Sequence, residues 1–325
     1  MKLVIQIPCF NEQDTILGVL NSIPKTIKGV DELLIFLLFD GSNYDTVKIA
    51  KEFGVQKIIS SKTNIGLAKT FMKGVEASLE SQADILVNID GDNQYKASEI
   101  EKLIQPILEN KADIVVGSRP IDKIQTFSFL KKNLQKFGSL MVKLISNINI
   151  KDAPSGFRAY SKNALLNINV FNDFTYTIET ILQAKDKNLI LQNVDIEVNE
   201  QKNRKSKLFS SNFDYIFKQT KNLIRFFIIY QPAKFFVFLA NILFSFGFLL
   251  GLRFLYFYFN LDGQGHIQSL ILCSIVLILS FICYMLAIIG DLFSINRKLM
   301  ENVQFELRQK NTKNNICDNI KLLNA

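Results

Sequence analysis

Short apolar runs alternate with longer amphipathic stretches over the first two thirds of the chain. Each run is rich in β-branched residues and is followed by residues at helical spacing, which is the pattern of βαβ units. The predicted strands are LVIQIP, LLIFLLFD, VQKIIS, ILVNID and DIVVGS, and the predicted helices between them span residues 12–22, 44–53, 67–80 and 98–109. This order predicts an α/β fold with a mostly parallel sheet covered on both faces.

The predicted strands all lead into polar or turn-forming segments. These segments are PCFNE, DGSN, TNIG, DGDNQ and GSR. Ligands of open parallel sheets bind beyond the carboxyl ends of the strands, so these segments are the candidate site. Neither G-x-G-x-x-G nor G-x-x-x-x-G-K-[ST] follows a strand, which argues against a dinucleotide-binding Rossmann domain and a P-loop ATPase. Any phosphate group must therefore be bound by residues other than a glycine-rich loop of these two types.

The hydrophobic pattern changes from Phe235 onward. Residues 235–259 and 267–290 form two apolar runs that are nearly free of charge. Each is close to the roughly 20 residues that cross a bilayer as a helix. Their length and composition favour two transmembrane helices over buried core helices.

The net charge of +8 raises the question of nucleic acid, but its distribution argues against that partner. Eight lysine and arginine residues lie between residues 202 and 234, Arg297 and Lys298 follow the second run, and the connector NLDGQGH has neither type. By the positive-inside rule both ends of the hairpin are cytoplasmic. The basic stretch predicts contact with anionic lipid headgroups, and a solvated charged face is the alternative. Four cysteines without metal-ligand spacing indicate a reducing compartment.

These patterns predict an integral membrane protein, in a prokaryotic plasma membrane or an ER-type membrane, with both termini in the cytoplasm. The predicted layout is a soluble domain over 1–207, an amphipathic juxtamembrane helical region over 208–232, two transmembrane helices within 233–292, and a cytoplasmic tail over 293–325. The amphipathic region alternates apolar residues at helical spacing with basic residues, which is typical of a helix lying on a membrane face.

Two carboxylates follow the fourth predicted strand. Asp90 and Asp92 lie two residues apart, so they point to the same side, and a divalent cation would relieve their repulsion. Mg²⁺ and Mn²⁺ take such oxygen ligands together with phosphate and water oxygens, and Gln94 offers another oxygen. An EF-hand loop is excluded because Tyr95 occupies its glycine position and a strand precedes it. Capping of the next helix is the structural alternative.

The motifs taken together resemble one family. IPCFNE, DGS, NIGLAK, DGDNQ, GSR and SGFRAY, in this order, are similar to the motifs of family 2 glycosyltransferases, which have a GT-A fold. With two carboxy-terminal spans and GHIQSL, the chain resembles the polyprenyl-phosphate branch, the dolichyl-phosphate mannose synthase-like enzymes. The resemblance covers nearly the whole length.

The resemblance implies a role for each matched residue on the donor side. It assigns Asp90 and Asp92 to the metal ion and the donor diphosphate, with Gln94 as a further metal-site residue. It implies a nucleotide pocket and neighbouring substrate contacts that include Pro8, Asn11, Glu12, Asp40, Ser42, Asn64 and Gly66. Asp40 and Ser42 match the end of the family's D-D-G-S, whose first aspartate is replaced here by Phe39. That departure puts nucleotide contacts in question.

The resemblance also implies positively charged groups near the phosphates of the donor and of the acceptor. Arg119 matches an arginine near the phosphates, and Arg204, Lys205 and Lys207 match a basic loop beside the acceptor phosphate. The residues that match the loop flanking the sugar are Ser155, Gly156 and Arg158. Asp92, Arg119 and Arg204 are thus the expected catalytic residues.

These roles imply inverting transfer of one hexose from a nucleotide-diphosphate sugar to polyprenyl phosphate at the cytoplasmic membrane face. A phosphate monoester is already largely dianionic near neutral pH, because its second pKa is about 6, and needs positioning more than a general base. A lipid hydroxyl acceptor would need a base, and Asp92 or Asp152 is then the candidate.

A catalytically silent nucleotide-sugar binder or scaffold is the alternative in a different class. A processive polysaccharide synthase is nearly excluded, because such enzymes carry Q-x-x-R-W and this chain has no tryptophan. The sequence leaves open the sugar, the formation of homo-oligomers, and the roles of Glu179 and His266.

Overall fold

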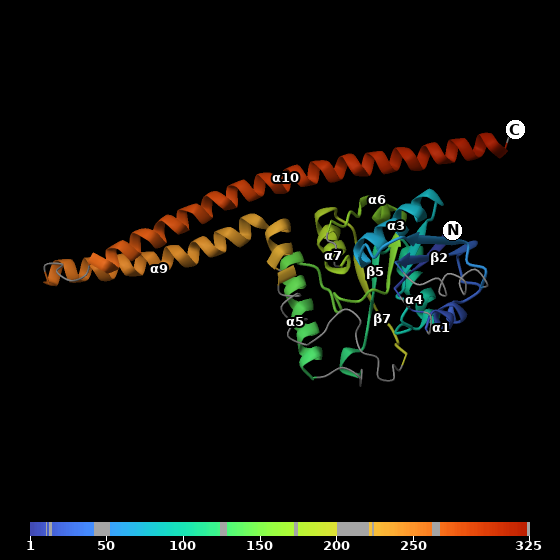
Figure 1. Cartoon of the computed structure of the whole chain (residues 1–325), viewed down its shortest axis with the longest axis horizontal. Helices are drawn as coiled ribbons and strands as arrows, with labels where there is room; N and C mark the ends of the chain where they lie inside the picture. Colours follow the sequence, from blue (N-terminus) through green and yellow to red (C-terminus); the bar gives the residue numbers. More distant parts are fainter. Residues whose placement is uncertain are drawn as a thin grey trace. The chain divides into compact units, whose positions relative to one another are not determined.

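The computed structural model describes the chain as an α/β domain and two long helices (Figure 1). The described residues are 1–10, 12, 15–41, 53–123, 129–171, 175–199, 221–222, 224–261 and 267–323. The strands are β1 (Lys2–Cys9), β2 (Glu32–Asp40), β3 (Lys57–Ser61), β4 (Ile85–Asn88), β5 (Ile114–Ser118), β6 (Arg158–Ser161) and β7 (Leu191–Asp195). The α-helices are α1 (Ile16–Ser22), α3 (Leu67–Glu80), α4 (Ile100–Leu108), α5 (Phe129–Ser146), α6 (Lys162–Asn167), α7 (Thr177–Asp186), α9 (Pro232–Leu261) and α10 (Ile267–Leu323). Two 3₁₀ helices, η1 (Ala97–Glu99) and η2 (Ile121–Lys123), complete the described elements.

The strands form one mostly parallel sheet in the order β3-β2-β1-β4-β6-β5-β7. Only β6 runs antiparallel to its neighbours, β4 and β5. The five strands expected from the sequence are β1 to β5, and the predicted helix over 67–80 is α3. The sequence did not predict β6 or β7. The four residues of β6 lead directly into α6, and such a short segment carries too little alternation to be recognised.

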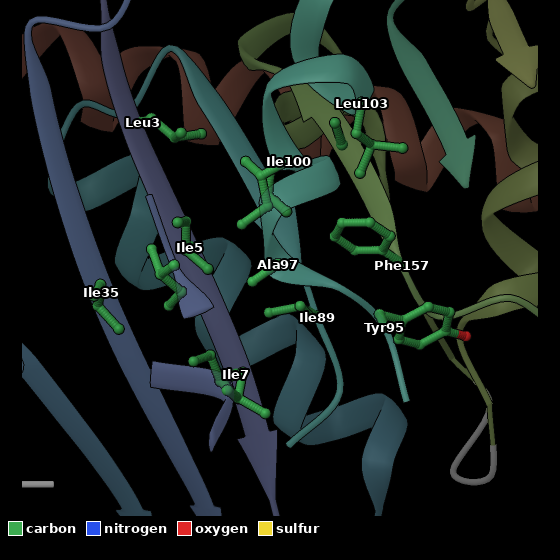
Figure 2. Packing of buried hydrophobic residues seen from close by; sticks show 14 of the residues in the cluster. Leu3, Ile5, Ile7, Ile35, Ile89, Tyr95, Ala97, Ile100, Leu103 and Phe157 are labelled. Atoms are coloured by element: carbon green, nitrogen blue, oxygen red, sulfur yellow. The ribbon is translucent and has the colours of Figure 1, made fainter. Parts of the chain in front are cut away.

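Both faces of the sheet are covered, as the apolar runs predict. Along β1, Leu3, Ile5 and Ile7 belong to a cluster that includes Ile100 and Leu103 of α4 (Figure 2). Between them Val4 and Gln6 point to the opposite face and are also buried.

That opposite face is packed against α3 and α7. The ring of Phe71 on α3 stacks on Tyr176, the residue before α7, with ring centroids 4.0 Å apart. The β4 strand therefore lies in the middle of a sheet that is covered on both faces, and its carboxyl end emerges from this core.

The chain divides into two compact units, Met1–Ile216 with Glu301–Ala325, and Phe217–Met300. Helices α9 and α10 include segments, Pro232–Asn260 and Ile267–Thr312, that are long and apolar enough to cross a membrane. Helix α10 continues to Leu323, well past the predicted end of the second span. Its last part belongs to the first unit, where Arg308 Nη1 donates to the Ile168 carbonyl at 2.7 Å. The domain boundaries assigned from the sequence stay a prediction.

Candidate active site

The paired carboxylates lie just beyond the carboxyl end of β4, in the middle of the sheet. Gly91 separates them, and the end of β1 approaches it closely. A Cβ at Gly91 would lie 2.9 Å from Cys9 Sγ and 3.3 Å from the Pro8 carbonyl oxygen. Packing therefore favours glycine between the two aspartates, because a side chain at this position would push the turn away from β1.

Asp90 lies against the loop that precedes β6. A Cβ built on Gly156 would be 2.7 Å from Asp90 Oδ2, so the backbone at Gly156 occupies the space beside the carboxylate. Burial, together with the neighbouring charge of Asp92, raises the pKa of Asp90 from its usual 3.8 to about 7, against a lowering by Arg119. Ionisation of both carboxylates is therefore unfavourable in this environment, and a bound cation would make it favourable.

A methyl group at Gly156 is expected to disturb this carboxylate. Gly156→Ala would place an atom well inside contact distance of Asp90 Oδ2, so Asp90 must turn away. We expect sugar transfer to fall about 100-fold, because small displacements of a charge-stabilising group cost this much. Product formation from a nucleotide sugar measures the effect.

The matched control is Gly138→Ala in α5, where a Cβ meets no atom within 4 Å. This change is expected to leave transfer intact and to stabilise the helix by about 0.5–1 kcal/mol. Equal activity losses in both variants would contradict the account of Gly156.

Gly156 is held in place by buried hydrogen bonds that the sequence did not predict. Asn88 Nδ2 donates to the Gly156 carbonyl at 2.8 Å, and the Tyr176 hydroxyl donates to the same oxygen at 3.1 Å. The Gly156 amide donates to the Tyr95 hydroxyl at 3.1 Å. Burial raises the pKa of Tyr95 to about 12, so this hydroxyl stays protonated. One available signal was Asn88 itself, a polar residue inside the apolar run ILVNID.

Arg119 is fixed beside the carboxylates by Asp152. Its Nε and Nη2 atoms donate to Asp152 Oδ2 and Oδ1 at 2.7 and 2.9 Å, and its backbone amide also donates to Oδ2 at 3.2 Å. Its Nη1 donates to Gln94 Oε1 at 3.4 Å. The two charged side chains are only 6% and 1% exposed. This two-point pair orients the guanidinium, and it engages both oxygens of Asp152, which the sequence had offered as a candidate base.

Other predicted residues hold the backbone around the site. Asp40 Oδ1 and Oδ2 accept from the amides of Ile65 and Gly66 at 2.6 and 2.9 Å, and Asn64 Oδ1 accepts from Gly66 at 3.0 Å. These bonds fix the loop that leads into α3. The expected substrate contacts of Asp40, Asn64 and Gly66 stay predictions.

Glu12 lies after the end of β1 and is linked to the carboxylate turn through Thr15. The Thr15 hydroxyl lies 3.1 Å from Glu12 Oε2 and donates to the Gly91 carbonyl at 2.7 Å. Glu12 is also one of the charges that raise the pKa of Asp90. The turn between Asp90 and Asp92 is therefore connected to the start of α1.

The remaining matched residues of SGFRAY are buried in the protein. Ser155 Oγ donates to the Gly117 carbonyl at 2.6 Å. The Arg158 guanidinium donates to the carbonyls of Ser155, Ala153 and Thr177 and to Thr180 Oγ1, at 2.6–2.8 Å. Arg158 thus binds the loop before β6 to α7. Its expected contact with substrate stays a prediction.

Glu179 and Phe39 are also buried. Glu179 is 2% exposed, and its Oε1 accepts from the Phe171 amide at 3.2 Å, so it is not a solvated residue of a helix surface. Phe39, the replacement for the first aspartate of D-D-G-S, is 2% exposed within the core cluster. This position therefore contributes no polar group to a nucleotide. Several predicted residues lie outside the described part of the chain, namely Asn11, Ser42, Arg204, Lys205, Lys207 and His266.

Comparison with known proteins agrees with the order of motifs. The profile of Glycosyl transferase family 2 matches residues 4–168, about half of the chain. The chain belongs to this family. The matched range begins in β1 and ends just after α6, so it contains the carboxylate turn, Arg119 and the SGFR loop.

Relatives of this glycosyltransferase include enzymes named for lipid-phosphate acceptors. The UDP-N-acetylglucosamine--dolichyl-phosphate N-acetylglucosaminyltransferase of Methanococcus voltae is 33% identical over 49% of this chain and 69% of its own length. The undecaprenyl-phosphate mannosyltransferase of Micrococcus luteus is 25% identical over 51% of this chain and 68% of its own length. Both alignments cover about half of the chain.

Solved structures confirm the GT-A fold. Glucosyl-3-phosphoglycerate synthase from Mycobacterium tuberculosis, in complex with Mn²⁺ and uridine-diphosphate-glucose, superimposes with a TM-score of 0.52. The sequences are 20% identical, and the match covers 69% of this chain and 76% of that chain. At this identity the likeness shows the fold alone.

The residues of this glycosyltransferase fit a divalent cation that is shared with a phosphate ligand. Among the described residues no three His, Cys, Asp or Glu side chains form a group able to hold a metal by themselves. Magnesium is commonly bound by one or two carboxylates together with substrate phosphates and water. Asp90 and Asp92 supply this incomplete set. Burial and the charge of Asp92 raise the pKa of Asp90, so a cation beside the two carboxylates would stabilise their ionised forms.

The raised pKa of Asp90 predicts a pH effect with an unusual sign. Because the folded protein holds this proton more tightly than the unfolded chain, the stabilisation is present below pH 3.8 and is lost as pH rises to about 7. In a chelator, the Asp90→Asn variant is therefore expected to gain stability over the unmodified protein as pH rises from about 4 to about 7. Melting temperatures of both proteins across this range measure the difference, and a constant difference would contradict the assignment.

Proposed function

We propose that this enzyme transfers a single hexose from a nucleotide-diphosphate sugar to polyprenyl phosphate, with inversion at the sugar and with a bound Mg²⁺ or Mn²⁺ ion. The reaction would occur at the cytoplasmic face of the membrane. The names of two relatives support the acceptor class. Two helices long and apolar enough to cross a bilayer support a lipid substrate.

The observation that carries the proposal is the arrangement of charge at the end of β4. Two neighbouring carboxylates, whose repulsion contributes to the raised pKa of Asp90, lie beside the Arg119 guanidinium, and Asp152 holds that guanidinium in place. A donor diphosphate needs a cation bound to protein carboxylates and a fixed positive side chain near its oxygens. Preorganised charges of this kind stabilise the charge that develops on a leaving group.

In the reaction, a phosphate oxygen of the acceptor forms a bond to the anomeric carbon while the bond from that carbon to the donor's β-phosphate oxygen breaks. When bound, the divalent ion would neutralise charge on the departing diphosphate. Arg119 would stabilise the same charge from a fixed position. A general base is unnecessary because the acceptor phosphate is already ionised. A lipid hydroxyl acceptor would need a base, and both carboxylate oxygens of Asp152, a candidate for that base, accept hydrogen bonds from Arg119. This supports a phosphate acceptor over a hydroxyl acceptor.

The acceptor phosphate also needs positive groups, and the basic residues Arg204, Lys205 and Lys207 remain the candidates from the sequence. They precede the first apolar helix by about 25 residues. A lipid phosphate lies at headgroup level, where such a cluster attracts it.

The proposal is tested with the full chain in lipid nanodiscs, radiolabelled nucleotide hexoses and N-acetylhexosamines, and Mn²⁺ or Mg²⁺. Undecaprenyl phosphate is compared with undecaprenol of the same length. We expect one labelled sugar per lipid with the phosphate and none with the alcohol. Absence of lipid-linked product with every donor, or transfer to undecaprenol, would overturn the proposal.

A second candidate is a nucleotide-sugar binder without turnover, and the burial of Phe39 favours it because a polar nucleotide contact is absent there. Equilibrium dialysis with the same donors separates the two. Saturable binding of a nucleotide sugar without any product would support the binder.

A further inference from the structure

Helix α5 carries two apolar rows, one buried together with polar side chains and one exposed at the surface; the buried row includes Val142 and Ile145, which are 1% and 6% exposed. Its inward side chains recur at helical spacing and include Gln135, Ser139 and Ser146, each at most 6% exposed. On the other side Phe137, Leu140 and Leu144 are 57%, 51% and 65% exposed. A row of large apolar side chains exposed along one side of a helix is the informative observation at a protein surface.

The orientation of α5 is fixed by hydrogen bonds on its buried side. Ser139 Oγ accepts from the Ala153 amide at 3.1 Å, and Ser146 Oγ donates to the Val142 carbonyl at 2.7 Å and accepts from the Ile148 amide at 3.1 Å. A rotation that buried the apolar row would break the bond to Ala153 and expose the buried side chains of Val142 and Ile145. The exposed row is therefore a stable surface of the domain.

Lysines accompany the apolar row. Lys132, Lys136 and Lys143 recur along one flank of α5, between its buried side and its apolar side. Lys132 Nζ donates to the Asp122 carbonyl at 2.8 Å and Lys136 Nζ pairs with the Asp122 carboxylate at 2.6 Å, which holds both on that flank. Lys143 is exposed. An apolar stripe with lysines along its border is the pattern of a helix that lies in a membrane interface.

We propose that the outer face of α5, formed by Phe137, Leu140 and Leu144 and bordered by these lysines, binds the surface of an anionic lipid bilayer. The apolar side chains would enter the boundary between headgroups and acyl chains, about 5–10 Å deep in comparable helices. The lysines would bind lipid phosphates at the same level. The presence of two helices able to cross a bilayer favours lipid over a second copy of the chain as the occupant.

This surface differs from the amphipathic region over 208–232 that the sequence predicts, because α5 lies within the catalytic domain, between β5 and β6. It does not depend on sugar transfer, so it can fail while the transfer assay succeeds.

The absence of tryptophan from the chain provides a direct test. Leu140→Trp and Leu144→Trp each introduce the only tryptophan at an exposed position, where a larger ring is accommodated. Each full-length variant is placed in nanodiscs of phosphatidylcholine and phosphatidylglycerol, with or without bromine on the upper part of the acyl chains. Because bromine quenches only tryptophan in close contact, we expect emission to fall roughly two-fold at both positions.

The matched control is Leu17→Trp in α1, which is the same substitution at a side chain that is 44% exposed. Helix α1 lies far from α5 in the domain (Figure 1). Its emission is expected to change little on bromination. The proposal is overturned if both α5 positions are quenched no more than Leu17→Trp, or if their emission is blue-shifted but unquenched, which indicates that protein covers the face. Unchanged melting temperatures establish that the variants are folded.

Discussion

Replacing Asp92 with asparagine is expected to reduce sugar transfer by about a thousand-fold while leaving the domain folded. Asparagine keeps the size of the side chain and removes the charge that a divalent ion and the donor diphosphate require. Removing that charge also removes a repulsion from Asp90, because Asp92 is one of the causes that raise the pKa of Asp90. In a chelator the variant is therefore expected to melt at the same temperature as the unmodified protein or at a higher one.

The matched control is Asp195→Asn, at the end of β7. Asp195 is the last residue of a strand, but its side chain is 71% exposed and pairs with Lys151 at the surface. Its loss is expected to change transfer and stability little, because exposed ion pairs contribute about 0–1 kcal/mol. Near-normal transfer by Asp92→Asn would refute the role of the carboxylate pair. Equal loss in both variants would mean that the effect is not specific to the site.

Breaking the pair between Arg119 and Asp152 is expected to destabilise the domain and to abolish transfer. Replacing Asp152 with alanine leaves a guanidinium buried without its carboxylate, which costs about 3–5 kcal/mol of unfolding free energy. The double variant Arg119→Met with Asp152→Ala removes both charges, so most of that stability is expected to return. Transfer is expected to stay at background in both variants, because neither holds a fixed cation near the diphosphate.

A double-mutant cycle measures this coupling. Thermal unfolding and product formation are measured on Arg119→Met, on Asp152→Ala and on the double variant. A coupling energy near zero would contradict the buried pair that the structure shows. Recovery of transfer in the double variant would contradict the catalytic role of Arg119, while leaving the structural role of the pair intact.

The sequence by itself determined the class of the fold, its first five strands and the edge of the sheet at which the candidate site lies. Short apolar runs rich in β-branched residues, such as LVIQIP and ILVNID, favour strands buried on both faces, and parallel strands bring their carboxyl ends to one edge. The D-G-D turn was therefore expected at that edge, and its place in the middle of the edge came from the strand order in the structure. The two apolar helices were equally evident, because their composition is unsuited to water. These features follow from local pattern and chain direction.

Only the tertiary structure decided which of the candidate polar residues make hydrogen bonds that support neighbouring loops. Arg158, Ser155 and Asp40 have the composition of site residues, yet their hydrogen bonds go to the backbone of neighbouring loops. The pairing of Asp152 with Arg119 and the outward apolar face of α5 were likewise invisible in the pattern. The physical reason is that hydrogen-bond partners and burial depend on contacts between segments tens of residues apart, which spacing along the chain does not specify.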